Sequence, residues 1–194
     1  MSSRGAKNSQ TAAAQRTLSY RRKVSVHFGV SEYQNWTSLK NGASDADALA
    51  KRFNIALNFD QQYVVKNQEV TKERIEAVFR DLANCHEDDL IVVTWSGHGC
   101  PFKLANKNDA GFLVPYDAPF PISLSNAMEY VEMAELGNWA DKYIVTKHVV
   151  FLLDCCFSGL SNSRGGGSMT EGAKRMVSKH LQMRCRYVIN AGTK

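Results

Sequence analysis

Two residues in this sequence have the side chains and surroundings that nucleophilic catalysis requires. His98 lies between two glycines in the run WSGHG, and Cys156 lies in the run DCCFSG further along the chain. A cysteine attacks a carbonyl carbon as its thiolate, which forms when a nearby base accepts the proton. Imidazole is such a base near neutral pH. A single cysteine or histidine is more often structural, but the two runs together indicate acyl-transfer chemistry.

Each of the two runs directly follows an apolar segment of strand length. Leu90–Trp95 precedes the histidine, and His148–Leu153 precedes the cysteine. Continuous apolar runs of this kind are typical of strands buried on both faces of a parallel sheet. In such sheets the carboxyl ends of neighbouring strands meet at one edge, where ligands bind. We therefore expect His98 and Cys156 to lie close together.

The rest of the chain alternates strand and helix patterns, which predicts an α/β fold with a mostly parallel sheet and helices on both faces. An apolar stripe predicts a helix near 44–58, with Ser44 and Asp47 resembling a capping box. Thr71 is expected to cap a second helix. The predicted strands are 24–30, 63–65, 90–95, 148–153 and 186–190; a third helix is expected near 128–143, after a long connection.

Length and composition restrict the class of protein. The 194 residues fit one globular domain, which we assign to 23–194 after a disordered basic tail at 1–22. The net charge of +5 comes from basic ends, while the centre is acidic, so no nucleic-acid partner is expected. No apolar run reaches membrane-spanning length, and the first residues have no apolar segment, so no secretory signal is expected. Five cysteines without a CxxC pair fit a reducing, cytoplasmic setting.

The two motifs resemble the catalytic motifs of the caspase-like cysteine peptidases, the clan of caspases, metacaspases and paracaspases. The form DCCFSG is most similar to bacterial caspase-like proteins and orthocaspases, which often have Phe where metacaspases have His. Weaker matches are VHFGVSEYQNWTSLKNGASDADALAKRF, GFLVPYDA and YVINAGT, so the resemblance covers about 24–194. It implies a caspase-like sandwich fold and cysteine endopeptidase activity.

The resemblance also implies a role for each matched residue. Cys156 is the nucleophile and His98 the base, while Cys155 is a bystander. The backbone amides of Gly99 and Cys156 form the oxyanion hole. The first specificity pocket is lined by Asp45, Ser96 and Asp154.

Two carboxylates in that pocket predict cleavage after Arg or Lys. Asp45 has a second interpretation as a charge that only stabilises a helix N-terminus. Asp154 likewise has a second interpretation, as a residue that only orders the nucleophile loop.

Some features depart from the family pattern. Family domains continue beyond the position of Lys194, so the chain is expected to be a fragment, a split polypeptide or a reduced form. The edge strand at 186–190 is expected to pair with a second chain or a homodimer partner. Asp109 and Asp117 lie where calcium-dependent relatives have acidic clusters, but the paired aspartates are missing. Calcium dependence is therefore not supported, and no cofactor is expected.

The glycine- and serine-rich loop 161–175 predicts a processing site, with Arg164, Lys174 and Arg175 as candidate cleavage positions. Two other functions stay open. The chain could be a catalytically inactive caspase homologue that acts as a scaffold or regulatory subunit. It could also be a flavodoxin-like ligand-binding domain with incidental thiols.

Overall fold

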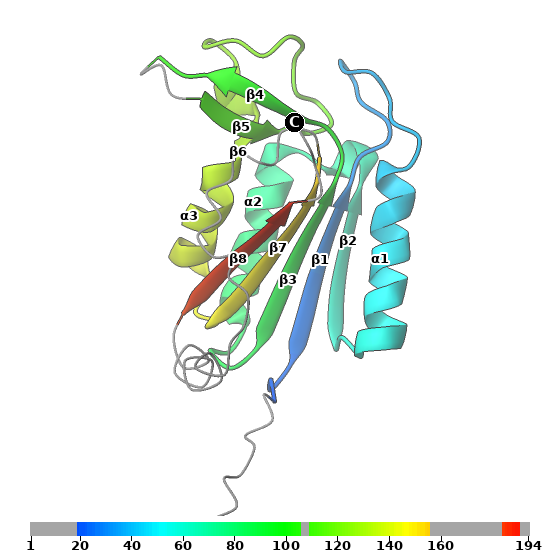
Figure 1. Ribbon diagram of the computed structural model, residues 1–194, viewed down its shortest axis with the longest axis vertical. Coiled ribbons are helices and arrows are strands. Elements are labelled where there is room, and N and C mark those ends of the chain that lie inside the picture. The colour runs from blue at the N-terminus through cyan, green and yellow to red at the C-terminus, as the bar shows by residue number, and fades with distance from the viewer. Residues whose placement is uncertain (1–18, 106–108, 156–183, 191–194) are drawn as a thin grey trace, which may run out of the picture.

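The computed structural model describes residues 19–105, 109–155 and 184–190. Its main feature is a five-stranded parallel sheet in the order β2-β1-β3-β7-β8 (Figure 1). The strands are β1 (Lys23–Gly29), β2 (Gln61–Lys66), β3 (Leu90–Ser96), β7 (His148–Asp154) and β8 (Cys185–Asn190). The predicted α/β fold with a mostly parallel sheet is thus confirmed.

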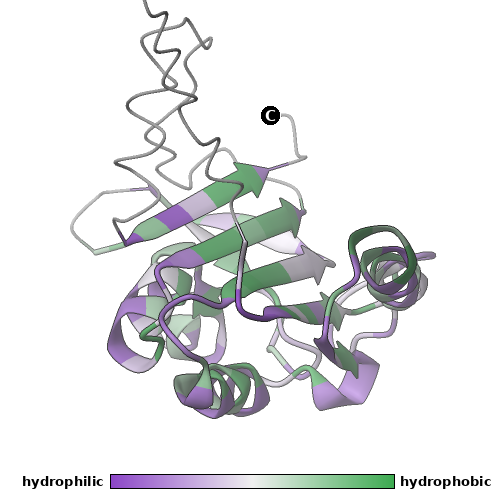
Figure 2. Ribbon diagram, turned by 90° about the horizontal axis from the view of Figure 1, so that it is seen from below, coloured by the Kyte–Doolittle hydropathy of each residue, from purple (hydrophilic) through white to green (hydrophobic). Residues whose placement is uncertain are grey.

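Helices cover both faces of this sheet, as the strand and helix pattern predicts. Helix α1 (Gly42–Leu57) lies on one face, and α2 (Lys72–Asp81) and α3 (Met133–Tyr143) lie on the other (Figure 2). Short 3-10 helices occupy Asn67–Glu69, Leu82–Asn84 and Ala127–Glu129. The larger core lies on the α2 and α3 side and includes Phe28, Phe79, Trp95, Trp139 and Phe151. Burial of these side chains is the main source of stability.

Two of the predicted helix starts differ from those observed. Helix α1 begins at Gly42 rather than near Ser44, and its N-terminus is capped from outside: the Ala43 N–H donates to Ser31 Oγ over 2.8 Å. Ser44 instead donates to the Asn41 carbonyl within the first turn. The third helix begins at Met133, five residues later than expected. Thr71 does cap α2, since its hydroxyl accepts the Arg74 N–H over 3.2 Å.

A second, smaller sheet replaces the long connection that the sequence predicts after His98. Strands β4 (Gly99–Lys103), β5 (Asp109–Leu113) and β6 (Val131–Glu132) pair antiparallel at the carboxyl end of the main sheet (Figure 1). Glycine and proline within β4 weaken its strand pattern, and β6 has only two residues. The described part of the connection therefore contains a small sheet that begins directly after the histidine.

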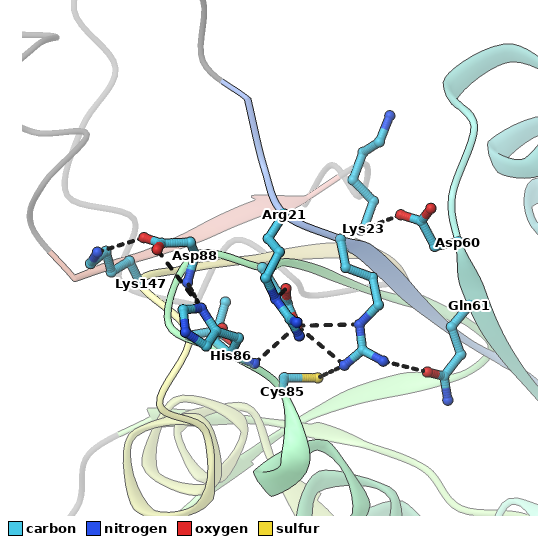
Figure 3. A network of polar contacts seen from close by, with 11 residues as sticks. Arg21, Lys23, Asp60, Gln61, Cys85, His86, Asp88 and Lys147 are labelled. Atoms are coloured by element: carbon cyan, nitrogen blue, oxygen red, sulfur yellow. Dashed lines mark hydrogen bonds and ion pairs between the residues drawn. The ribbon is translucent and has the colours of Figure 1, made fainter.

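The amino ends of the strands, at the opposite end of the sheet, are held by a network of paired charges (Figure 3). Asp89 is fully buried, and its carboxylate accepts hydrogen bonds from Arg21, Arg22 and the backbone N–H of His86. Burial alone would raise the pKa of Asp89, but these hydrogen bonds and positive charges outweigh it and lower the pKa. The network attaches the start of β1 to the start of β3. Arg21 and Arg22 belong to the range assigned to the basic tail.

None of the described helices is long and apolar enough to cross a membrane.

Candidate active site

The histidine lies in a two-residue turn at the carboxyl end of β3. Gly97 is required there, because an added Cβ would lie 2.7 Å from the Tyr33 hydroxyl oxygen and 3.2 Å from Trp95 Nε1. The turn is fixed by backbone hydrogen bonds: Gly97 N–H donates to the Asp154 carbonyl over 3.3 Å, and Val114 N–H donates to the His98 carbonyl over 3.2 Å. The turn is therefore attached both to β7 and to the small sheet.

The loop after β1 holds the His98 side chain. Its ring Nε2 lies 2.7 Å from the carbonyl oxygen of Thr37. The His98 backbone N–H donates to the Tyr33 hydroxyl over 2.6 Å, and the Tyr33 and Trp36 rings lie 4.8 and 5.6 Å from the imidazole. Burial raises the pKa of Tyr33, so its hydroxyl stays protonated. Backbone and ring contacts together leave the imidazole in one orientation.

The contact with Thr37 also determines which ring nitrogen carries the hydrogen. A carbonyl oxygen can only accept, so Nε2 of His98 must be the N–H that donates to it. In the neutral imidazole, Nδ1 then has the free lone pair. A histidine held in this tautomer can take a proton through Nδ1 while its other nitrogen stays bound.

Strand β7 brings the second motif to the same edge. Ser96 and Asp154 are direct partners in the parallel register of β3 and β7, so the two motifs leave neighbouring strands side by side. Cys155 is 6% exposed and belongs to the main core, as expected for a residue that is not the nucleophile. Cys156 itself lies outside the described residues, as do Arg164, Lys174 and Arg175.

The three pocket candidates come from element ends that adjoin. Ser96 is buried, and Asp154 is exposed. Helix α1 reaches this edge because Gly42 packs against it: an added Cβ would lie 2.8 Å from the Ser96 carbonyl oxygen. Asp45 is in the first turn of α1. Within the described part of the chain, neither the Asp45 nor the Asp154 carboxylate has a hydrogen-bond or ion-pair partner.

Gly99, the oxyanion-hole candidate, is the buried first residue of β4 and pairs in register with Leu113. Its position directly after His98 is thus fixed by the small sheet. Across the ranges that the structure describes, no group of three or more His, Cys, Asp or Glu side chains is arranged to hold a metal ion.

The sequence prediction missed the residues that hold the histidine. Thr37 acts through its backbone carbonyl, so its side chain gives no signal. Tyr33 and Trp36 lie in the run EYQNW, where two aromatic residues in a polar loop are the one visible sign. Their contacts with His98 span more than 60 residues of sequence.

Comparison with known proteins shows the family of the chain and supports its fold. The caspase domain family model matches residues 22–188, and the chain therefore belongs to the caspase domain family. A solved structure of a protein from Geobacter sulfurreducens superposes with a TM-score of 0.56 at 14% identity, covering 87% of this chain and 57% of that one. This likeness shows the fold.

Two caspase structures superpose with lower TM-scores. Caspase-1 from Spodoptera frugiperda gives a TM-score of 0.49 at 18% identity, with coverage of 80% of this chain and 55% of that chain. The structure of pro-sf-caspase-1 gives the same TM-score and identity, with 79% and 58% coverage. The chain thus spans 55–58% of the length of these structures. A search of curated proteins gave no match.

Proposed function

We propose that this protein is a cysteine endopeptidase of the bacterial caspase-like type, related to metacaspases and orthocaspases, with Cys156 and His98 as its catalytic dyad. One observation carries the proposal: His98 is fixed, through Nε2 and the Thr37 carbonyl, at the edge where β7 leads into Cys156. A histidine that only filled a turn would not need a defined tautomer. The family gives the reaction class.

The reaction follows from these roles. His98 Nδ1 accepts the proton of the Cys156 thiol, and the thiolate attacks the scissile carbonyl carbon. The backbone N–H groups of Gly99 and Cys156 stabilise the negative oxygen. His98 then gives its proton to the leaving amine as the C–N bond breaks, which leaves a thioester. Water, deprotonated by His98, hydrolyses the thioester and restores the thiol.

The proposed substrate residue on the acyl side of the scissile bond is Arg or Lys. Asp45 and Asp154 are carboxylates at one edge, without ion-pair partners in the described ranges. A guanidinium can make charge-assisted, bidentate hydrogen bonds to them, whereas an acidic side chain is repelled. Other acidic residues such as Asp88, Asp89 and Glu135 are already paired with cations. Asp45 and Asp154 are thus available, within the described ranges, to pair with a cationic substrate side chain.

Active-site labelling tests the proposal. Acyloxymethyl ketones that carry Arg or Asp next to the reactive group are incubated with the protein, and the labelled residue is identified by mass spectrometry. We expect labelling at Cys156 by the Arg reagent, weaker labelling by the Asp reagent, and none in Cys156→Ala. A folded protein that neither reagent labels would refute the peptidase and favour a non-catalytic scaffold.

Two further predictions from the sequence belong to this proposal. Tyr187 and Ile189 of the edge strand β8 are 47% and 59% exposed, which supports pairing with a second chain or a second copy through this edge. Light scattering at high micromolar concentration would detect the pair. Self-cleavage at Arg164, Lys174 or Arg175 would match the proposed specificity and should require Cys156. No cofactor is included in the proposal, and a cytoplasmic location stays a prediction.

A further inference from the structure

A row of aromatic rings leads from His98 to the surface. The Trp36 ring lies 5.6 Å from the imidazole, and the Phe120 ring packs edge-on against Trp36, with centroids 4.9 Å apart. Phe120 is nonetheless 63% exposed, so a ligand can reach its ring. Both rings are uncharged, unlike the carboxylates Asp45 and Asp154.

The backbone that presents Phe120 is fixed by hydrogen bonds. Trp36 Nε1 donates to the Pro119 carbonyl over 3.4 Å, and the Tyr130 hydroxyl donates to the same oxygen. Asn35 Nδ2 donates to the carbonyls of Asp117 and Ala118 over 3.1 and 3.2 Å. The backbone that leads to the ring is therefore held in place before any ligand arrives, so binding there costs little backbone entropy.

The chemistry of the cleavage determines which part of a substrate lies near these rings. His98 must come within hydrogen-bond distance of the leaving amine in order to protonate it. The residue that carries this amine therefore has its side chain beside His98 and the rings that pack on it. The residue on the acyl side is directed instead to the pocket candidates Asp45, Ser96 and Asp154.

We propose that Trp36 and Phe120 form the subsite for the first residue on the amine side of the scissile bond, and that this subsite selects a large apolar side chain. The inference rests on the proposed peptidase activity and adds a second specificity element to it. Leu or Phe on the substrate would cover the exposed face of Phe120. Gly would leave that face in water, and Asp would place a charge against it.

Internally quenched peptides test the subsite. They share Arg on the acyl side and carry Gly, Leu, Phe or Asp as the next residue, and kcat/KM is measured for each. We expect Leu and Phe to be cleaved at least about tenfold faster than Gly, with Asp slowest. Phe120→Ala should reduce the preference to about threefold or less. Met128→Ala is the matched control, because Met128 is also a large apolar side chain and is 84% exposed.

A second substrate separates the two proposals. An N-acyl-arginine methyl ester has only methanol as its leaving group, so its cleavage by the unchanged protein reports the proposed peptidase without occupying the subsite. If this ester is not cleaved at all, the proposed peptidase function fails. If it is cleaved but the peptides show no apolar preference, or Phe120→Ala leaves that preference intact, the subsite assignment alone is overturned.

Discussion

The two ends of the main sheet use charge in opposite ways. At the amino end, the buried Asp89 is enclosed by Arg21, Arg22 and a backbone N–H. At the carboxyl end, the Asp45 and Asp154 carboxylates have no partners within the described ranges. A buried charge without a partner would cost several kcal/mol, so the paired end stabilises the fold. The unpaired carboxylates lie at solvent-accessible positions, where a positively charged substrate can supply the missing partner.

The difference shows that aspartates at opposite ends of the same sheet, about one strand length apart, can have separate roles. Asp88 and Asp89 directly precede β3, while Ser96 and His98 directly follow its last apolar residues. Changes at the amino end should therefore alter stability without altering specificity. Changes at the carboxyl end should do the reverse.

Loss of the nucleophile should have the largest effect. Cys156→Ala is expected to lower kcat/KM on an arginyl coumarin amide by at least about 1,000-fold, because alanine has no thiol to form the bond to the substrate carbonyl carbon. Cys155→Ala should keep most of the activity, since Cys155 packs in the core. Steady-state kinetics on both variants, with circular dichroism to verify folding, decides this. Activity that survives in Cys156→Ala would contradict the assignment of Cys156 as the nucleophile.

Breaking the amino-end network should cost stability. Asp89→Asn leaves Arg21 and Arg22 without their buried counter-charge and is expected to lower the free energy of unfolding by about 2–4 kcal/mol. The partial exposure of both arginines reduces the effect from the full cost of a buried pair. Urea unfolding measures the change. The ratio of cleavage after Arg to cleavage after Asp should be unchanged, and a shifted ratio would contradict the separation of the two ends.

Removing a pocket carboxylate should change specificity rather than stability. Asp154→Ala is expected to lower kcat/KM for Arg substrates about 10- to 100-fold, with little change in urea midpoint. Asp45→Ala should act in the same direction. Asp88→Ala is the control, because Asp88 pairs with Lys147 at the other end of the sheet. An unchanged Arg preference in Asp154→Ala would leave Asp154 as a residue that only orders its loop.

A buried histidine between the two ends should make stability depend on pH. His27 is 0% exposed, with its ring nitrogens 3.0 and 2.9 Å from the hydroxyls of Thr94 and Ser25. Burial lowers its pKa from 6.5 to about 4. The neutral form thus contributes stability above pH 6.5, and this is lost as pH falls from 6.5 toward 4.

Between pH 7 and pH 5 we expect a loss of about 1–2 kcal/mol that His27→Gln reduces. Urea unfolding at the two pH values measures it. An equal acid loss in both proteins would assign the pH dependence to groups other than His27.

Sequence patterns alone predicted the parallel sheet, the order of its motifs and the two catalytic candidates, because each depends on local residue type. Apolar runs such as Leu90–Trp95 can be buried on both faces only in a sheet covered by helices. The parallel direction of β3 and β7 then brings their carboxyl ends together. The resemblance to caspase-like peptidases followed from the short runs WSGHG and DCCFSG, and the caspase domain family match confirms it.

The tertiary structure decided what the local pattern could not. The Thr37 carbonyl that fixes the tautomer of His98 is a backbone atom 61 residues away, and every residue has such an atom. The antiparallel sheet of β4, β5 and β6 is formed by short pairings that no single segment specifies. Asp89 is paired, whereas Asp154 has no partner among the residues that the structure describes; the difference depends on which distant arginines the fold brings near. Local residue type sets the chemistry of each group, and only long-range packing sets its partner.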